Sequence, residues 1–414
     1  MLKEITGGIC AAAGFKAGAV RAGIKATSPK DKPDIAIIFS ENRATAAAVY
    51  TTNKVKGAPL LVTKEHLRDG KCQAVIVNSG NANTCNANGI EIAVGACRLT
   101  AEALGIEPGD VAVASTGVIG QPMSIVPFEK HIPALAKSLR HSPDASREVV
   151  RAIMTTDTRE KSAAFEFSLS GSENEKICRI GGISKGSGMI APNMATMLCF
   201  ITTDVNITES CLHEALLTAN RKTFNQVSVD RDTSTNDTVL IMASGLAGND
   251  VIDDTKSRSY AVFLENLYGV MRHLARETAR DGEGATKLIE CRVTGALTER
   301  TAAVIAKSVV ESNLLKAAIF AADANWGRIL CAIGYADADF DINKVDVVIS
   351  SEAGSVKVCE NAAGTSFRDE DAHNVLLADE ILITVNLFGG GAEAFAWGCD
   401  LTYDYVKINA EYRT

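Results

Sequence analysis

Residues 185–198 read Lys185-Gly-Ser-Gly-Met-Ile-Ala-Pro-Asn-Met-Ala-Thr196-Met-Leu198, a polar glycine-rich loop that runs directly into an apolar segment. The apolar segment, residues 196–201, is typical of a buried strand. The loop matches neither of the glycine patterns that bind phosphate. A threonine inside a chain is a weak nucleophile, whereas a threonine that begins a chain can use its own α-amine as the base. From the pattern alone, Thr196 as an ordinary strand residue remains the simpler interpretation.

Apolar runs and helical spacing extend the prediction to the whole chain. Residues spaced three or four apart on one face predict helices at residues 92–103 and 264–278, and we expect a further helix at about residues 300–320. Because strands and helices interleave, the predicted fold class is α/β or α+β. Short apolar runs predict buried strands at residues 35–39, 74–77, 111–114, 239–243, 345–349 and 381–385.

Composition excludes several classes of protein. The 414 residues carry 42 Lys and Arg against 50 Asp and Glu, a net charge of -8, without a basic cluster of the kind that binds nucleic acid. No apolar run approaches the roughly 18 residues of a membrane span, and no signal peptide is evident. We therefore expect a cytoplasmic protein with neither a nucleic-acid nor a membrane partner.

Cysteine and histidine patterns argue against a metal site. The eleven cysteines form no CxxC pair and fit buried thiols in a reducing compartment. The six histidines lie outside every polar motif, which leaves a Ser-His-Asp triad or a histidine-ligated metal without support. If the chain carries out acyl chemistry, its base is not imidazole.

Three polar segments are candidates for chemistry. In Ser115-Thr-Gly-Val-Ile-Gly120, a predicted strand ends in a turn that could direct hydrogen-bond donors at an oxyanion, although from this fragment alone an ordinary strand-to-loop turn is the simpler interpretation. In Asp281-Gly-Glu-Gly284, Gly282 is well placed to cap the preceding helix, and Glu283 either binds an amine or is a solvated turn residue. Residues 230–238, rich in Asp and Thr, form either a metal or polar-substrate site or, as we prefer, a buried hydrogen-bonded turn.

Taken together, the polar segments resemble the ornithine acetyltransferase family, also called glutamate N-acetyltransferases, of arginine biosynthesis. The resemblance covers nearly the whole chain, with a mild departure at residues 159–161, where the family often has Pro before the Lys. Its specificity comes from eight motifs in the family's order: residues 78–84, 115–120, 154–158, 185–198, 228–238, 281–287, 323–329 and 409–414.

The resemblance implies a self-cleaving enzyme. Cleavage between Ala195 and Thr196 would give an α chain of residues 1–195 and a β chain that begins at the nucleophile Thr196. Thr116 and Gly117 match the family's oxyanion-hole pair. The substrate-binding positions that match are Thr155 (with Thr156 as second choice), Lys185, Thr196, Glu283, Asn409 and Thr414.

The family also implies an architecture. It predicts a layered αββα-type core, of the kind shared with self-cleaving β-aminopeptidases, over residues 1–285. A smaller C-terminal α/β lobe would follow over residues 286–414, and its tail would return to the active site. The implied assembly contains two α and two β chains.

The implied reaction moves an acetyl group from N-acetylornithine to glutamate through an acetyl-Thr196 intermediate. It requires no metal and no organic cofactor, although part of the family also takes acetyl-CoA as co-substrate, and we expect the same of this chain. Two alternatives stay open: a self-cleaved amidase or aminopeptidase with water as the acceptor, and an uncleaved amino-acid-binding protein.

Overall fold

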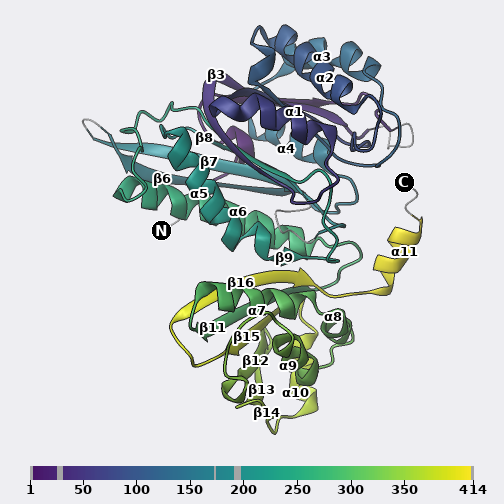
Figure 1. Cartoon of the computed structure of the whole chain (residues 1–414), viewed down its shortest axis with the longest axis vertical. Helices are drawn as coiled ribbons and strands as arrows, with labels where there is room; N and C mark the ends of the chain where they lie inside the picture. The colour runs from purple at the N-terminus through teal and green to yellow at the C-terminus, as the bar shows by residue number, and fades with distance from the viewer. Residues whose placement is uncertain (1–2, 26–30, 172–173, 191–196, 412–414) are drawn as a thin grey trace.

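The computed structural model describes residues 3–25, 31–171, 174–190 and 197–411, which form two lobes (Figure 1). The first lobe contains a nine-stranded sheet and helices α1–α6, and the second lobe, residues 288–399, contains most of a seven-stranded sheet and helices α7–α10. The strands of the first sheet, in spatial order, are β1 (Lys3–Glu4), β6 (Lys161–Ser170), β7 (Glu175–Lys185), β8 (Leu198–Thr203), β10 (Thr238–Ala243), β3 (Ile35–Tyr50), β4 (Lys71–Asn78) and β5 (Val111–Ser115), with β2 (Phe15–Val20) also on β3.

The long strand β3 folds the first sheet over on itself. Its first half pairs with β2 and β4 and its second half with β10, and the register on β4 shifts between Phe39 and Ala44. Side chains alternate between two faces along a strand, so each half of β3 contributes to two cores. Ala36 and Ala46, from opposite halves, both lie in the core enclosed between the two parts of the sheet. The sheet therefore provides two facing layers.

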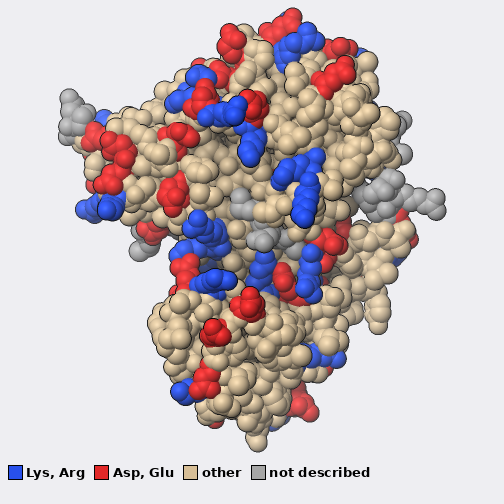
Figure 2. Space-filling model, viewed as in Figure 1, with Lys and Arg blue, Asp and Glu red and all other residues tan. Residues whose placement is uncertain are grey.

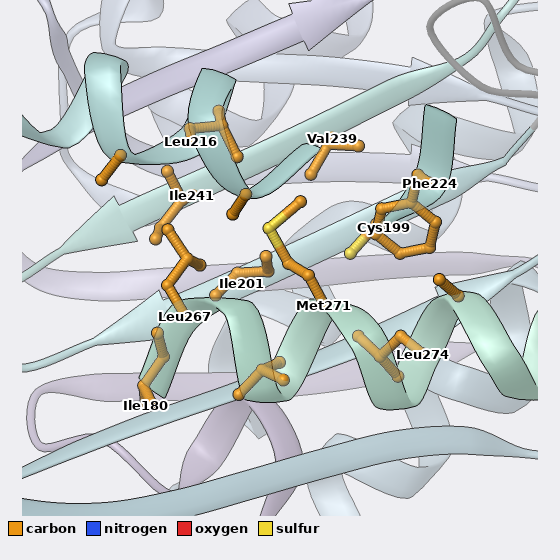
Figure 3. Packing of buried hydrophobic residues seen from close by; sticks show 14 of the residues in the cluster. Ile180, Cys199, Ile201, Leu216, Phe224, Val239, Ile241, Leu267, Met271 and Leu274 are labelled. Carbon is orange, nitrogen blue, oxygen red and sulfur yellow. The ribbon is translucent and has the colours of Figure 1, made fainter. Parts of the chain in front are cut away.

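Helices cover both outer faces of these layers. Helices α1 (Ala58–His66), α2 (Gly89–Leu104) and α3 (Val126–Ser138) pack on one side, where Ile37 and Ile76 face them. Helices α5 (Glu209–Lys222) and α6 (Arg258–Arg280) pack on the other, where Leu267 and Met271 of α6 meet β7, β8 and β10 (Figure 3). Helix α4 (Pro143–Ile153) contributes to the core between the layers. The predicted αββα-type core is confirmed.

The second lobe has a sheet and core of its own. Its helices are α7 (Glu299–Glu311), α8 (Asn313–Phe320), α9 (Trp326–Gly334) and α10 (Asp369–Leu376). The sheet of this lobe also contains one short strand, β9, that precedes residue 285 in the sequence. The predicted division of the chain at residue 285 stays a prediction. The strands, in spatial order, are β14 (Ala363–Gly364), β13 (Gly354–Glu360), β12 (Asp346–Ser351), β15 (Glu380–Asn386), β11 (Leu288–Ala296), β16 (Ala392–Cys399) and β9 (Val227–Ser228).

Two local predictions need correction. The single helix expected at residues 300–320 is two helices, because the Ser312 hydroxyl accepts the Leu315 N–H at 3.3 Å and starts α8 afresh. The capping role expected of Gly282 is also wrong, since the positive φ after α6 occurs at Gly284 (φ +69°). A side chain at Gly282 would instead collide with the Cys399 sulfur, 2.6 Å from its Cβ position.

Ion pairs join the two lobes where Lys and Arg side chains gather between them (Figure 2). Arg280 of α6 lies 3.0 Å from Glu380 of β15, and Arg276 contacts the same carboxylate. Helix α11 (Tyr403–Glu411) follows the second lobe and lies to one side of it, at the level where the lobes meet (Figure 1). Within the described part of the chain, no helix is both long enough and apolar enough to span a membrane.

Candidate active site

Three predicted site residues from separate segments meet at one ammonium group. Lys185 ends β7, and its Nζ donates to Thr155 Oγ1 at 2.9 Å and to Thr116 Oγ1 at 3.3 Å. Thr116 directly follows β5, and Thr155 follows α4. The three segments converge because β5, β7 and α4 all end near the same point. Thr155, the first choice over Thr156, is thereby placed beside Lys185.

Gly117 allows two strand ends to approach each other closely. Its φ is +127°, and a Cβ there would lie 2.4 Å from the main-chain carbon of Gly80, so no other residue fits. The neighbouring Thr116 N–H donates to the Asn78 carbonyl at 3.0 Å, and the Val118 N–H to the Gly80 carbonyl at 3.4 Å. The main chain at residues 116–118 is therefore held in a fixed turn beside Lys185.

Glu283 and Asn409 form the opposite part of the candidate site. The Asn409 side-chain amide donates to Glu283 Oε2 at 2.8 Å, so helix α11 reaches the first lobe. The Glu283 N–H donates to the Ser187 carbonyl at 3.0 Å, and a side chain at Gly188 would occupy the place of the Glu283 carboxylate. Residues 186–188 thus lie between Lys185 and Glu283.

Three predicted residues, Ala195, Thr196 and Thr414, lie outside the described residues. The described main chain on either side of residues 191–196 is anchored by the segment 230–238. Asp230 accepts the N–H groups of Met189 and Ile190 at 2.6 and 2.8 Å, and the Met197 carbonyl accepts the Thr238 N–H at 3.0 Å. This segment is a hydrogen-bonded turn network, the interpretation that the sequence favoured.

Asn236 and Asp237 belong to this network and were not singled out by the sequence analysis. The Asn236 amide donates to the carbonyls of Ala82 and Ser115 at 2.6 and 2.9 Å, which ties the turn to the end of β5. The Asp237 carboxyl is buried and accepts the Met197 N–H, while its Oδ2 has no partner among the described residues. Burial raises the pKa of Asp237 well above its ordinary value.

The sequence analysis assigned no individual role to Asp157, Lys161 or Asp281. Their side chains form a buried ion-pair network next to Lys185. A lysine at the start of a strand is normally predicted to be solvent-exposed. The two carboxylates that pair with Lys161 lie four and 120 residues away from it in the sequence. Among the described residues, no group of three or more His, Cys, Asp or Glu side chains could hold a metal ion. The residues that converge are instead suited to a ligand that carries charges of both signs.

Comparisons with known proteins identify the family of this chain. The model of the ArgJ family matches residues 16–414. The arginine biosynthesis bifunctional protein ArgJ of Caldanaerobacter subterraneus subsp. tengcongensis is 48% identical over 402 residues, 97% of each chain. Its counterpart from Symbiobacterium thermophilum is 48% identical over 414 residues, 100% of each. A crystal structure of ArgJ from Bacillus halodurans is 47% identical, with a TM-score of 0.49, and covers 51% of this chain and 98% of its own. With nearly its whole length matched by the family model, this chain belongs to the ArgJ family.

Proposed function

We propose that this chain is a glutamate N-acetyltransferase of arginine biosynthesis, which moves acetyl from N-acetylornithine to glutamate. The observation that carries the proposal is the pair of opposite charges, Lys185 and Glu283, on either side of residues 186–188. N-acetylornithine presents a carboxylate and a side-chain ammonium. Lys185, with its hydroxyl neighbours, suits the first, and Glu283, braced by Asn409, suits the second.

Self-cleavage would create the nucleophile. The Thr196 hydroxyl attacks the Ala195 carbonyl carbon, the peptide C–N bond breaks as the nitrogen takes a proton, and an ester joins the two chains. Breaking that bond frees the Thr196 α-amine, and water then hydrolyses the ester and frees the Ala195 carboxylate and the Thr196 hydroxyl. That amine, with an ordinary pKa near about 7.7–8.0, then serves as the base for the Thr196 hydroxyl.

Acetyl transfer uses the same hydroxyl twice. Thr196 attacks the acetyl carbonyl of N-acetylornithine, and ornithine leaves with the proton that the α-amine has taken up. The amine of glutamate then attacks the acetyl ester and carries the acetyl group away. Thr116 and Gly117 would stabilise the oxyanion in both steps, and the loss of one such donor typically costs about 2.7–4 kcal/mol.

Several finer points belong to the same proposal. The reaction needs no metal or organic cofactor, acetyl-CoA serves as a second acetyl donor, and the assembly contains two α and two β chains. Thr414 would join Asn409 at the substrate. The ArgJ relatives that are 48% identical over nearly their whole length are named bifunctional, which supports the use of a second donor.

The hydrolytic alternative, an amidase or aminopeptidase, differs only in its acceptor. An assay with N-acetylornithine separates the two, since a transferase releases ornithine in proportion to glutamate and makes N-acetylglutamate. Release of acetate at the same rate without glutamate would favour the hydrolase.

Thr196→Ala tests the proposal as a whole. On a denaturing gel, wild-type protein should give two fragments that meet at Thr196. The variant should remain one band of 43.7 kDa and lose acetyl transfer. Thr218→Ala, on helix α5, is the matched control and should retain both properties. Loss of cleavage with full transfer, or the reverse, would show that the two reactions use different groups.

A further inference from the structure

Four buried charges of alternating sign form a row that ends at Lys185. Lys161 Nζ donates to Asp157 Oδ1 at 2.7 Å and to Asp281 Oδ2 at 2.5 Å. The side chains of these three residues are 1%, 0% and 2% exposed, respectively. Lys185 is also buried, and the charge of Asp157 acts on its ammonium group. The row Asp281–Lys161–Asp157–Lys185 is therefore electrically neutral.

Asp157 also holds the main chain on both sides of the Lys185 ammonium. Its Oδ1 accepts the Gly186 N–H at 2.6 Å, directly after Lys185 in the chain. Its Oδ2 accepts the N–H of Thr155, whose hydroxyl is hydrogen-bonded to Lys185. One carboxylate thus fixes both the residue that carries the ammonium and the threonine that orients it.

The surroundings decide whether Lys185 stays charged. Burial lowers the pKa of Lys185, and Asp157 is the strongest opposing influence. Lys161 lowers this pKa further, whereas Glu283, beyond α6, and Asp237, before β10, raise it. Among the described residues, Lys32 is a further charged neighbour, and its ammonium donates to the Met154 carbonyl at 2.6 Å. Of these groups, Asp157 is the one that also holds the main chain at Gly186.

We propose that Asp157 and Lys161 are positioning residues that keep the Lys185 ammonium charged and directed at Thr116 and Thr155, so that the site accepts a substrate carboxylate. Asp157 alone would neutralise Lys185 and compete with the incoming anion. Lys161 shares the Asp157 charge and leaves Lys185 available, and Asp281 balances Lys161. The inference rests on the proposed role of Lys185 in carboxylate binding.

The two positioning residues predict opposite pH effects. In Asp157→Asn, loss of the negative charge lowers the pKa of Lys185, so substrate binding should be lost at lower pH than in wild type. In Lys161→Gln, loss of the positive charge raises that pKa, so the alkaline loss of binding should move to higher pH. If the two residues had a purely structural role, both variants would bind substrate more weakly. The pH above which binding is lost, which we call the alkaline limb, would then not move in opposite directions in the two variants.

The experiment measures the KM for N-acetylornithine and the calorimetric Kd for ornithine across the alkaline range. Asp281→Asn is the matched control: it breaks the same network one ion pair further from Lys185, and its limb should stay near that of wild type. The proposal would be overturned if the alkaline limb moved in the same direction in all three variants, or if it moved in none of them. If Asp157→Asn does not fold, the direction found for Lys161→Gln decides alone.

A titration of isotope-labelled lysine by NMR separates this inference from the proposed function. The Lys185 signal is assigned by its loss in Lys185→Arg, and its titration needs no turnover. Opposite shifts of the Lys185 titration in the two variants support the positioning role even if acetyl transfer is absent, which would count against the proposed function alone. Unmoved titrations in an active enzyme would overturn the positioning role alone.

Discussion

The first lobe buries several charged side chains, some of them at its candidate site, whereas the core of the second lobe is almost entirely apolar. The charged residues of the first lobe with buried side chains are Asp34, Asp110, Asp157, Lys161, Lys185, Asp204, Asp237 and Asp281. In residues 288–399, all of which are described, Lys316 alone is buried and charged, and its ammonium contacts the Val229 carbonyl of the first lobe. Burying charge is costly. The contrast teaches that this protein accepts that cost in the lobe that contains the candidate site, and builds the core of the second lobe from hydrocarbon.

The largest expected effect comes from breaking the buried network. Asp281→Ala leaves the Lys161 ammonium with one carboxylate and removes the acceptor for the Thr158 and Arg159 N–H groups. Removal of one partner from a buried ion pair typically costs about 3–5 kcal/mol. We expect a loss of that size in the urea unfolding of Asp281→Ala. Asp371→Ala, an exposed carboxylate of the second lobe, is the control and should change stability by less than about 0.5 kcal/mol.

A core truncation in the second lobe should separate stability from activity. Ile383 is fully buried in the central strand β15, and Ile383→Ala should cost about 2–5 kcal/mol of unfolding free energy. Because this core holds no site residue, kcat and KM of the folded variant should match wild type. Equal losses of activity and stability would mean that the second lobe takes part in the chemistry.

Asp237→Asn should change how stability depends on pH. Burial raises the pKa of Asp237, so its contribution to stability is complete below the unfolded value near about 3.9 and is lost as pH rises through the folded value. The amide does not titrate, so the variant should lose less Tm than wild type between acidic and alkaline pH. Parallel Tm profiles for the two proteins would contradict the burial argument.

The smallest effect is expected at the tail. Asn409→Ala removes one exposed hydrogen bond to Glu283, worth about 0.5–1.5 kcal/mol. The KM for N-acetylornithine should therefore rise roughly 2- to 10-fold, with self-cleavage unchanged. Deletion of residues 411–414 should likewise weaken substrate binding and spare cleavage. An unchanged KM in both variants would remove the tail from the site.

Local patterns predicted the strands that are buried on both faces. Residues 35–39, 74–77, 111–114 and 239–243 all lie within strands of the first sheet, because continuous apolar runs have few other stable arrangements. The fold-over of β3 could not be predicted, since its register shift depends on partners as distant as β10. The break at Ser312 could have been predicted, because a serine before a helical run is a capping signal.

The candidate site was predictable only in part. Lys185, Glu283 and Asn409 were named from motifs that resemble a family, and the structure brings them near one another. Lys161 was not named, because a lysine is normally exposed. Only a tertiary contact, the ion pair with Asp281, offsets the free-energy cost of burying its charge. Buried charge depends on pairing across the fold, which no local pattern encodes.

The most direct measurement of the central claim is mass spectrometry of the protein incubated with N-acetylornithine in the absence of glutamate. The account predicts a fragment that begins at Thr196, gains the mass of one acetyl group, and loses it when glutamate is added. Acetyl transfer by a chain that stays uncleaved, or an acetyl group carried by a residue other than Thr196, would contradict it.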